Sequence, residues 1–212
     1  MSLFITFEGI EGSGKTTHLR HLAAQLRAAG HEVVETREPG GTPAGSAVRA
    51  LLLGSDAVPL SPLAELLLYC ADRAQHVEQV IRPALAAGRV VLCDRFSDST
   101  IAYQGYGRGL DLDTVRGLDA TARAGLWPDL TFLLDCPVPV GLARARERHG
   151  TPAGADRFER ETLEFHARVR AGFATLAAAE PGRFCTLDSA AGIPAVRVRM
   201  STAIERRLGG AL

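Results

Sequence analysis

The stretch that decides the fold is "GIEGSGKTT", residues 9–17, which follows the apolar run "LFITFE" and precedes an Ala/Leu-rich segment. Gly9 to Thr16 match the pattern G-x-x-x-x-G-K-[ST] between an expected strand and an expected helix, which is the context of a phosphate-binding loop. The glycines let backbone N–H groups face a phosphate, Lys15 would neutralise the outer phosphates, and the Thr16 hydroxyl would bind Mg²⁺. An ordinary glycine-rich turn is the alternative, and the flanking elements disfavour it.

The expected fold class is α/β, with a parallel sheet covered by helices on both faces. Continuous apolar runs are typical of parallel strands that are buried on both sides. Five such runs are expected to form strands: 3–8, 31–37, 89–94, 130–135 and 183–188. Segments with helical spacing alternate with them, at 15–30, 62–88, 111–125, 137–150, 156–180 and 193–208. Pro83 is expected to kink the second of these helices.

Polar residues stand where several expected strands finish. Glu8, Arg37, Asp94 and Asp135 each end an apolar run. The carboxyl ends of parallel strands meet at one edge of a sheet, where ligands bind in α/β folds. The sequence therefore predicts a site at that edge, within a single domain spanning residues 1–212.

Composition excludes some functions. Lys+Arg and Asp+Glu are equal at 24 each, so no overall field favours nucleic acid or an anionic membrane as a partner. No apolar run is long enough to span a bilayer. The N-terminal residues indicate a first strand rather than a signal peptide. Cys70, Cys93, Cys136 and Cys185 are scattered, and we interpret the last three as small buried hydrophobes in a cytoplasmic enzyme.

Within the phosphate-loop class, the chain favours a small-molecule kinase. No N-K-x-D guanine motif occurs, and the chain is short for a motor. A kinase needs cations for a second, phosphorylated substrate, and Arg37 in "TREPGGT" and Arg95 in "CDRFSDS" follow expected strands. Taken singly, either arginine could instead form a surface salt bridge.

Two aspartates after strands have competing interpretations. Asp94, after "RVVLC", is a candidate partner of the magnesium site, with a helix N-cap as the alternative. Asp135, after "LTFLL", is interpreted as structural, either capping a helix or pairing with an arginine.

A lid is expected at about residues 144–157. Arg144, Arg146 and Arg148 lead into the small-residue segment "GTPAGA". Such a loop favours a lid whose arginines reach the transferring phosphate and exclude water, and a solvated basic helix face is the alternative.

The motifs taken together resemble bacterial thymidylate kinases. The resemblance rests on "EGIEGSGKTT", "TREPGGT", "YCADRAQH", "DRFSDSTIAYQGYGRG" and "DRFE", in this order, and spans nearly the whole chain. It implies a P-loop nucleoside-monophosphate-kinase fold, ATP-dependent phosphorylation of dTMP to dTDP with Mg²⁺, and a homodimer.

The resemblance also implies roles for individual residues. Glu11 would contact the sugar 3′-hydroxyl, Arg37 and Arg95 the acceptor phosphate, and Glu38 the metal and its waters. Tyr69 would stack on thymine, although core packing in "LLLYC" is the alternative that the residues alone favour. Arg73 would contact a base carbonyl and Tyr103 would exclude a 2′-hydroxyl. The remaining implied contacts come from Pro39, Arg49, Ser99 and Gln104. Gly12 stands where the eukaryotic type has arginine, so the resemblance assigns the catalytic positive charge to the lid.

Besides the substrate-binding set, which is Glu11, Glu38, Pro39, Arg49, Tyr69, Arg73, Arg95, Ser99, Tyr103 and Gln104, the motif and the resemblance define three sets of expected site residues. The nucleotide-binding residues are Gly9, Ile10, Glu11, Gly12, Ser13, Gly14, Lys15, Thr16 and Thr17. The catalytic residues are Lys15, Arg37, Asp94, Arg95, Arg146 and Arg148, and the metal is expected near Thr16, Asp94 and Glu38. A kinase of another small acceptor and a non-catalytic nucleotide sensor are the competing functions.

Overall fold

The computed structural model describes residues 2–54, 59–149, 158–159 and 161–208, with the backbone alone at 148, 149 and 208. Its sheet has five parallel strands in the order β2-β3-β1-β4-β5. The strands are β1 (Leu3–Glu8), β2 (Val33–Arg37), β3 (Val90–Asp94), β4 (Leu130–Asp135) and β5 (Phe184–Asp188). The predicted strands are confirmed, with β2, β3 and β5 starting one or two residues later than expected.

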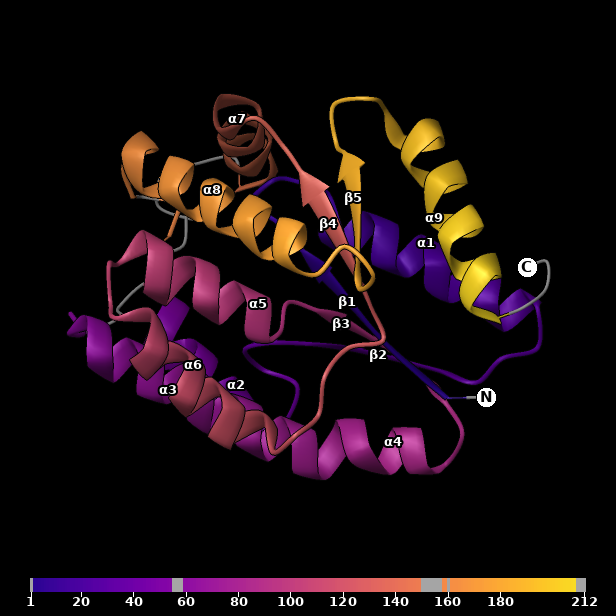
Figure 1. Ribbon diagram of the computed structural model, residues 1–212, viewed down its shortest axis with the longest axis horizontal. Coiled ribbons are helices and arrows are strands. Elements are labelled where there is room, and N and C mark those ends of the chain that lie inside the picture. Colours follow the sequence, from indigo (N-terminus) through magenta and orange to yellow (C-terminus); the bar gives the residue numbers. More distant parts are fainter. Residues whose placement is uncertain (1, 55–58, 150–157, 160, 209–212) are drawn as a thin grey trace.

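Helices connect the strands throughout the described chain (Figure 1). The α-helices are α1 (Lys15–Ala28), α2 (Pro43–Leu53), α3 (Pro62–His76), α4 (Arg82–Ala86), α5 (Ser97–Thr100), α6 (Leu112–Arg123), α7 (Val138–His149), α8 (Leu163–Ala179) and α9 (Ile193–Leu208). Two π-helical turns, η1 (Val77–Ile81) and η2 (Ile101–Gly107), follow α3 and α5.

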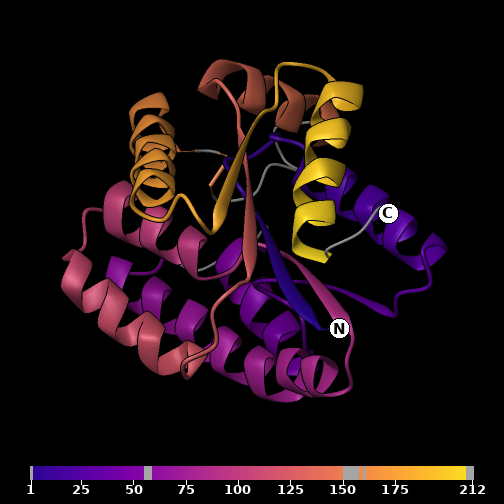
Figure 2. The same ribbon diagram turned by 45° about the vertical axis from the view of Figure 1, so that its right-hand side comes forward.

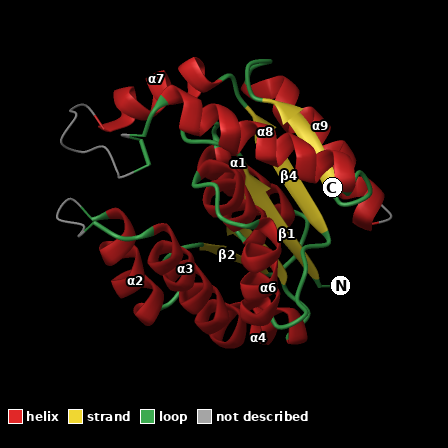
Figure 3. Ribbon diagram, turned by 60° about the vertical axis from the view of Figure 1, so that its left-hand side comes forward, coloured by secondary structure: helices red, strands yellow, loops and turns green. Residues whose placement is uncertain are grey.

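The sheet is the middle of three layers. Alternate residues of a strand face opposite sides, and Ile5 and Phe7 accordingly pack with α1 and α9. Phe4, between these two positions, joins a separate cluster with Val77 and Ile81 of the η1 turn. Figure 2 shows α1 and α9 together on one side of the strands, and Figure 3 shows the strands in yellow between red helices. The expected helices on both faces are therefore confirmed.

Three elements, α2, the short helix α5 and the η2 turn, lie outside the helical segments expected from the sequence. α2 begins with Thr42, whose hydroxyl accepts a hydrogen bond from the Gly45 N–H, followed by Pro43 in the first turn. This is an ordinary helix start, but the glycines and proline of the segment suggested a loop. The η2 turn carries Tyr103 and Gln104, and such turns are frequent at functional sites.

Other local differences have simple causes. A kink was expected at Pro83; Pro83 stands in the first turn of α4, directly after the π-helical η1 turn, so the hydrogen-bond pattern of the helical segment changes just before the proline. α8 begins at Leu163 rather than 156 because the Thr162 side chain caps it by accepting from the Phe165 N–H. Cys185 is half-buried, whereas Cys70, Cys93 and Cys136 are buried, and all four are free thiols.

In the described parts of the chain, every helix is too short or too polar to cross a lipid bilayer.

Candidate active site

The phosphate loop lies between β1 and α1, as predicted. Gly9, Gly12 and Gly14 have φ values of 135°, 66° and 95°, a region that side chains other than glycine rarely adopt. The first turn of α1 contains no acidic residue, so its N–H groups and positive dipole end are free of internal carboxylates. This is a loop that fits a phosphate chain.

The same loop is closely packed from behind. A Cβ added at Gly9 would lie 2.5 Å from the Leu134 carbonyl oxygen of β4, and one added at Gly12 would overlap the Gly141 carbonyl oxygen of α7. The structure therefore leaves no room for an arginine at position 12. This agrees with the expectation that positive charge comes from elsewhere.

Lys15 is held in place by the loop itself. Its Nζ donates to the carbonyl oxygens of Gly9 and Ile10, at 3.0 and 2.8 Å, and the side chain is buried. Burial and the nearby charge of Arg95 lower the pKa of Lys15 to about 8, against the opposing effect of Asp94. A bound phosphate would favour the ammonium form, because an opposite charge next to it raises the pKa.

Thr16 and Asp94 form a pair that suits a magnesium ion. The Thr16 hydroxyl donates to Asp94 Oδ2 over 2.6 Å, which brings two oxygen ligands together at the mouth of the loop. Among the described residues, no group of three or more His, Cys, Asp or Glu side chains could hold a metal by itself. A magnesium ion would therefore depend on nucleotide phosphates and water for its remaining ligands, as Mg²⁺ commonly does.

Glu38 stands apart from this pair. Its two carboxylate oxygens contact Arg73 Nε and His76 Nδ1, each at 2.9 Å, and its side chain is 2% exposed. The expected metal role of Glu38 stays a prediction. The observed contacts assign it the task of holding Arg73 against the end of β2.

Arg95 is placed by an unusual backbone conformation. Its φ is 72°, which is strained for a residue with a side chain, and its N–H donates to the Phe7 carbonyl oxygen. The guanidinium donates to Glu11 Oε1 at 2.9 Å and to Ser99 Oγ at 3.0 Å, and it stacks on the Tyr103 ring. Strain of this kind concentrates at functional sites, and here it directs a cation into the cavity.

Glu8 supports this arrangement from below. Its carboxylate accepts hydrogen bonds from the Phe96 N–H at 2.8 Å and the Ser99 hydroxyl at 2.5 Å. Burial, and then the neighbouring charge of Asp98, raise the pKa of Glu8 to about 8. Glu8 therefore holds Phe96 and Ser99 in place, directly after the strained residue Arg95.

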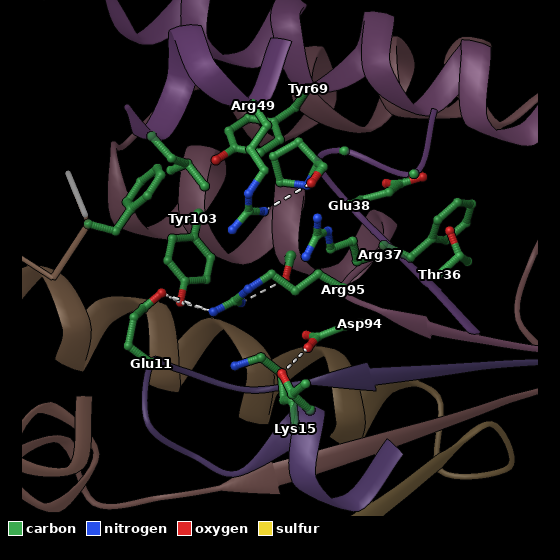
Figure 4. Close-up of a pocket in the computed structure, with 18 of the residues that line it drawn as sticks. Glu11, Lys15, Thr36, Arg37, Glu38, Arg49, Tyr69, Asp94, Arg95 and Tyr103 are labelled. Carbon is green, nitrogen blue, oxygen red and sulfur yellow. Dashed lines mark hydrogen bonds and ion pairs between the residues drawn. The ribbon is translucent and has the colours of Figure 1, made fainter. Parts of the chain in front are cut away.

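Two further arginines face the same space. Figure 4 shows the side chains of Arg37 and Arg49 reaching into the cavity, and the guanidinium of Arg95 directed toward Glu11. Arg49 Nη1 donates to the Pro39 carbonyl oxygen at 2.9 Å. Arg37 is exposed and has no hydrogen-bond or ion-pair partner among the residues that the structure describes, so its charge is available to a ligand.

The far end of the cavity contains the predicted base-binding residues. Arg73 is only 1% exposed and also donates to Asp119 Oδ1 at 2.7 Å and Thr100 Oγ1 at 2.9 Å. Most of its donors are therefore used internally, and its contact to a base stays a prediction. Tyr69 is half-buried in the cavity wall, four residues before Arg73 on α3. Gln104 Nε2 donates to Glu65 Oε1 at 2.9 Å.

Glu11 and Tyr103 meet where the two ends of the cavity join. The Tyr103 hydroxyl donates to Glu11 Oε1 over 2.6 Å, and both side chains are buried. Burial alone would raise the pKa of Glu11, but the Arg95 charge and the hydrogen bonds around it lower it far below its ordinary value. Glu11 is therefore an ionised carboxylate facing the cavity.

One cavity of about 1200 Å³ brings most of the expected residues together. Those that line it are Glu11, Gly12, Gly14, Lys15, Thr16, Thr17, Arg37, Glu38, Pro39, Arg49, Tyr69, Arg73, Asp94, Arg95, Ser99, Tyr103 and Gln104. Gly9, Ile10 and Ser13 are not among its lining residues. Thr100 and Phe158 also line it and were missed, although Phe158 belongs to the "DRFE" motif.

The expected lid is only partly described. Residues 150–157 and the Arg148 side chain lie outside the described part of the chain. Arg144 donates to the Ser189 hydroxyl at 3.1 Å, and Arg146 is exposed and does not line the cavity. The catalytic roles of Arg146 and Arg148 stay predictions. Asp135 pairs with Arg170 through both carboxylate oxygens, at 2.6 and 2.8 Å, which confirms its structural interpretation.

Comparisons with known proteins agree with this geometry. The family model described as thymidylate kinase matches residues 7–199. Thymidylate kinase of Solidesulfovibrio magneticus is 57% identical over 197 residues, which cover 92% of this chain and 94% of the relative. That of Geotalea uraniireducens is 53% identical over 210 residues, covering 98% and 99%. The crystal structure of thymidylate kinase from Ehrlichia chaffeensis superposes with a TM-score of 0.79 at 37% identity, covering 96% and 98%. The chain therefore belongs to the thymidylate kinase family.

Proposed function

We propose that the protein transfers the γ-phosphoryl group of ATP to dTMP and releases dTDP and ADP. The observation that carries the proposal is the single cavity that joins a phosphate loop to an arginine-lined pocket with an aromatic wall. Membership of the thymidylate kinase family supports dTMP as the acceptor. The competing functions, another acceptor or a nucleotide sensor, receive no support from a specific observation.

The donor is expected at the phosphate loop. Backbone N–H groups from Gly12 to Thr16 and the Lys15 ammonium would bind the β- and γ-phosphates. Thr16 would ligate Mg²⁺ directly and Asp94 would do so through water, since they already share a 2.6 Å hydrogen bond. When bound, Mg²⁺ neutralises charge on the phosphates.

The acceptor phosphate is expected between Arg95 and Arg37. These two cations would hold it in line with the γ-phosphate, so that one of its oxygens forms the new bond to phosphorus. The bond from phosphorus to the β–γ bridging oxygen then breaks, and ADP leaves with that oxygen. Positioning and charge neutralisation are the main demands of this reaction, and the site provides both.

The nucleoside of dTMP would occupy the far end of the cavity. Tyr69 offers a ring face for thymine, and Arg73, Ser99 and Gln104 offer polar contacts to the base. Glu11 would accept a hydrogen bond from the sugar 3′-hydroxyl. Tyr103, whose buried hydroxyl is bonded to Glu11, would stand beside the sugar and exclude a 2′-hydroxyl, so we expect a preference for deoxynucleotides.

An ADP-release assay with MgATP and a panel of dTMP, dUMP, UMP, CMP, AMP and GMP tests the proposal. We expect clear preference for dTMP over UMP, and loss of turnover in Lys15→Ala, which excludes a contaminating kinase. Turnover of another monophosphate without dTMP would overturn the acceptor. Absence of turnover across the panel, with ATP still bound, would overturn the enzymatic function.

Two further features belong to this proposal. The family resemblance implies a homodimer, and the exposed leucines Leu51, Leu63 and Leu67 on α2 and α3 supply an apolar surface for it. We also infer a single catalytic domain in the cytoplasm, where the free thiols of this chain are stable. No role for nucleic acid or a membrane is proposed.

A further inference from the structure

His166 is a buried histidine that the proposed reaction does not use directly. It lies on α8 with no exposed surface, and its ring is next to the phosphate loop. Nδ1 lies 3.3 Å from Glu11 Oε2, and Nε2 lies 3.0 Å from the Phe158 carbonyl oxygen. The ring therefore stands between the phosphate loop and a second wall of the cavity, because both Glu11 and Phe158 line that cavity.

The two oxygens of Glu11 have unequal surroundings. Oε1 accepts from Arg95 Nη2 at 2.9 Å and from the Tyr103 hydroxyl at 2.6 Å. Oε2 is buried and makes no full hydrogen bond within the described chain, and the same is true of His166 Nδ1 opposite it. A buried carboxylate oxygen without a donor costs free energy, so these two atoms are the natural partners of each other.

Both neighbours of the His166 ring are acceptors. The Phe158 carbonyl oxygen can only accept, so Nε2 is the donor in that hydrogen bond. A carboxylate oxygen can only accept, so the contact between Nδ1 and Glu11 Oε2, 3.3 Å apart, is satisfied when Nδ1 acts as the donor. The charged and titratable groups that face Glu11 from the other elements are Arg95, Tyr103 and Lys15.

We infer that His166 is a positioning residue that fixes the orientation of the Glu11 carboxylate and thereby the acceptor end of the site. This inference rests on the proposed function in one respect, which is that its kinetic test uses dTMP as the acceptor. It concerns a residue outside the expected catalytic, nucleotide-binding and substrate-binding sets.

The consequence for the site follows from the geometry of Arg95. A guanidinium and a carboxylate prefer to pair through two parallel hydrogen bonds. Glu11 Oε2 faces His166, so the carboxylate offers Arg95 only Oε1. Arg95 Nη1 donates instead to the Gly9 carbonyl oxygen and the Ser99 hydroxyl. Without a donor at position 166, the carboxylate is free to turn and offer both oxygens to Arg95. That turn would draw Arg95 away from the acceptor phosphate.

His166 also holds Phe158. The Phe158 ring packs edge-on against Tyr103, with ring centroids 5.2 Å apart. By holding Phe158, the hydrogen bond from Nε2 also supports Tyr103, whose hydroxyl donates to Glu11. The two nitrogens have separable tasks, since Nδ1 acts on Glu11 and Nε2 on Phe158.

Two substitutions separate these tasks. In His166→Asn the amide nitrogen can stand near the position of Nδ1, whereas in His166→Gln it can stand near that of Nε2. Each variant keeps one donor and loses the other. A loss of folding stability that comes simply from removing the histidine ring should therefore appear in both variants. We expect His166→Gln to raise the KM for dTMP roughly tenfold with an unchanged KM for ATP, because the Glu11 carboxylate loses the one polar contact that its Oε2 makes. We expect His166→Asn to stay within about threefold of the parent protein.

A double-mutant cycle provides the second readout. In a Glu11→Gln background, His166→Gln is expected to change the KM for dTMP little further, because the group it acts on is already altered. Val169→Ala, one turn along the same helix, is the control because it only loosens buried packing. Its effect on the KM for dTMP is expected to multiply with that of Glu11→Gln. Equal effects of His166→Asn and His166→Gln, or multiplying effects in the cycle, would show that His166 only packs.

A measurement on the unmodified residue covers the case in which the variants do not fold. The ¹⁵N signals of the His166 ring are expected to change in Glu11→Gln, with the larger change at Nδ1. An unchanged Nδ1 signal would overturn the inference. Failure of the parent protein to phosphorylate dTMP would instead reject the proposed acceptor and leave this spectroscopic test intact.

Discussion

At the scale of single residues, the buried carboxyl of Glu8 controls a pH dependence of stability. Burial, then the charge of Asp98, raise its pKa from the ordinary 4.5 to about 8. Between these values the folded protein binds more protons than the unfolded chain, so stability falls as pH rises through this window. We expect the decrease to reach up to about 1 kcal/mol per pH unit in urea unfolding, and to flatten in Glu8→Gln.

The matched control for Glu8 is Glu78→Gln, at an exposed position in the η1 turn. This variant should keep the slope of the parent protein across the window between the two pKa values of Glu8. An unchanged slope in Glu8→Gln would mean that another buried group, such as Asp98, carries the pH dependence.

Some residues of the candidate site could be proposed from their position in the sequence, and others could not. Lys15, Thr16, Asp94 and Arg95 were identifiable because a motif or a strand end places each of them locally. His166 was not, because its partner Glu11 lies far away in the sequence and only the packing of α8 joins them. The partners of Arg73 were hidden for the same reason, since Glu38 and Asp119 come from separate elements.

At the scale of elements, the contact between the phosphate loop and α7 has a testable cost. A Cβ added at Gly141 would lie 2.5 Å from the Glu11 carbonyl oxygen. We expect Gly141→Ala to lower the free energy of unfolding by about 1–3 kcal/mol and to raise the KM for ATP roughly tenfold, because the loop must shift. Urea unfolding and steady-state kinetics with ATP varied would measure both effects.

Gly117 in α6 offers the corresponding control. A Cβ at this position meets no atom within 4 Å. Gly117→Ala should therefore leave the kinetics unchanged and stabilise the protein by about 0.5–1 kcal/mol, the usual gain inside a helix. Identical behaviour of the two alanine variants would contradict a tight contact between α7 and the loop.

The elements themselves were predictable to different degrees. Strands were located within one or two residues because a short, continuous apolar run is typical of a parallel strand that is buried on both faces. α2 was missed because Pro43 and Gly45 suggest a loop, whereas capping by Thr42 and packing against α3 make the segment helical. The η2 turn has no periodic signature of its own, so its π-helical form followed only from tertiary packing.

At the scale of the whole molecule, the sheet order explains why distant motifs meet. β1 is central, β3 lies on one side of it and β4 on the other. The register pairs Phe7 with Asp94 and Asp94 with Arg37, so three strand ends lie side by side. The sequence predicted this edge from the polar residues that end each strand, but the order of the strands required the structure.

The last prediction concerns the apolar surface formed by Leu51, Leu63 and Leu67, which are 52%, 49% and 47% exposed. Leu63 and Leu67 are four residues apart and share one face of α3, which packs against α2. If this surface joins two copies of the chain, size-exclusion chromatography with light scattering should give twice the chain mass of 22.5 kDa. Leu63→Glu with Leu67→Glu should shift the mass toward that of a single chain, because unpaired charges are costly to bury.

Val198→Glu on α9 is the matched control for this surface, because Val198 is 67% exposed and belongs to a helix that packs against α1 and β5 instead. It should leave the mass unchanged. Loss of the dimer in Val198→Glu alone would move the interface to α9, and a single-chain mass for the parent protein would reject the dimer. Because Tyr69 and Arg73 lie on the same helix α3 as the two leucines, a confirmed interface would also join the proposed acceptor pocket to the contact between subunits. The KM for dTMP in the double leucine variant would then report whether dimerisation stabilises that pocket.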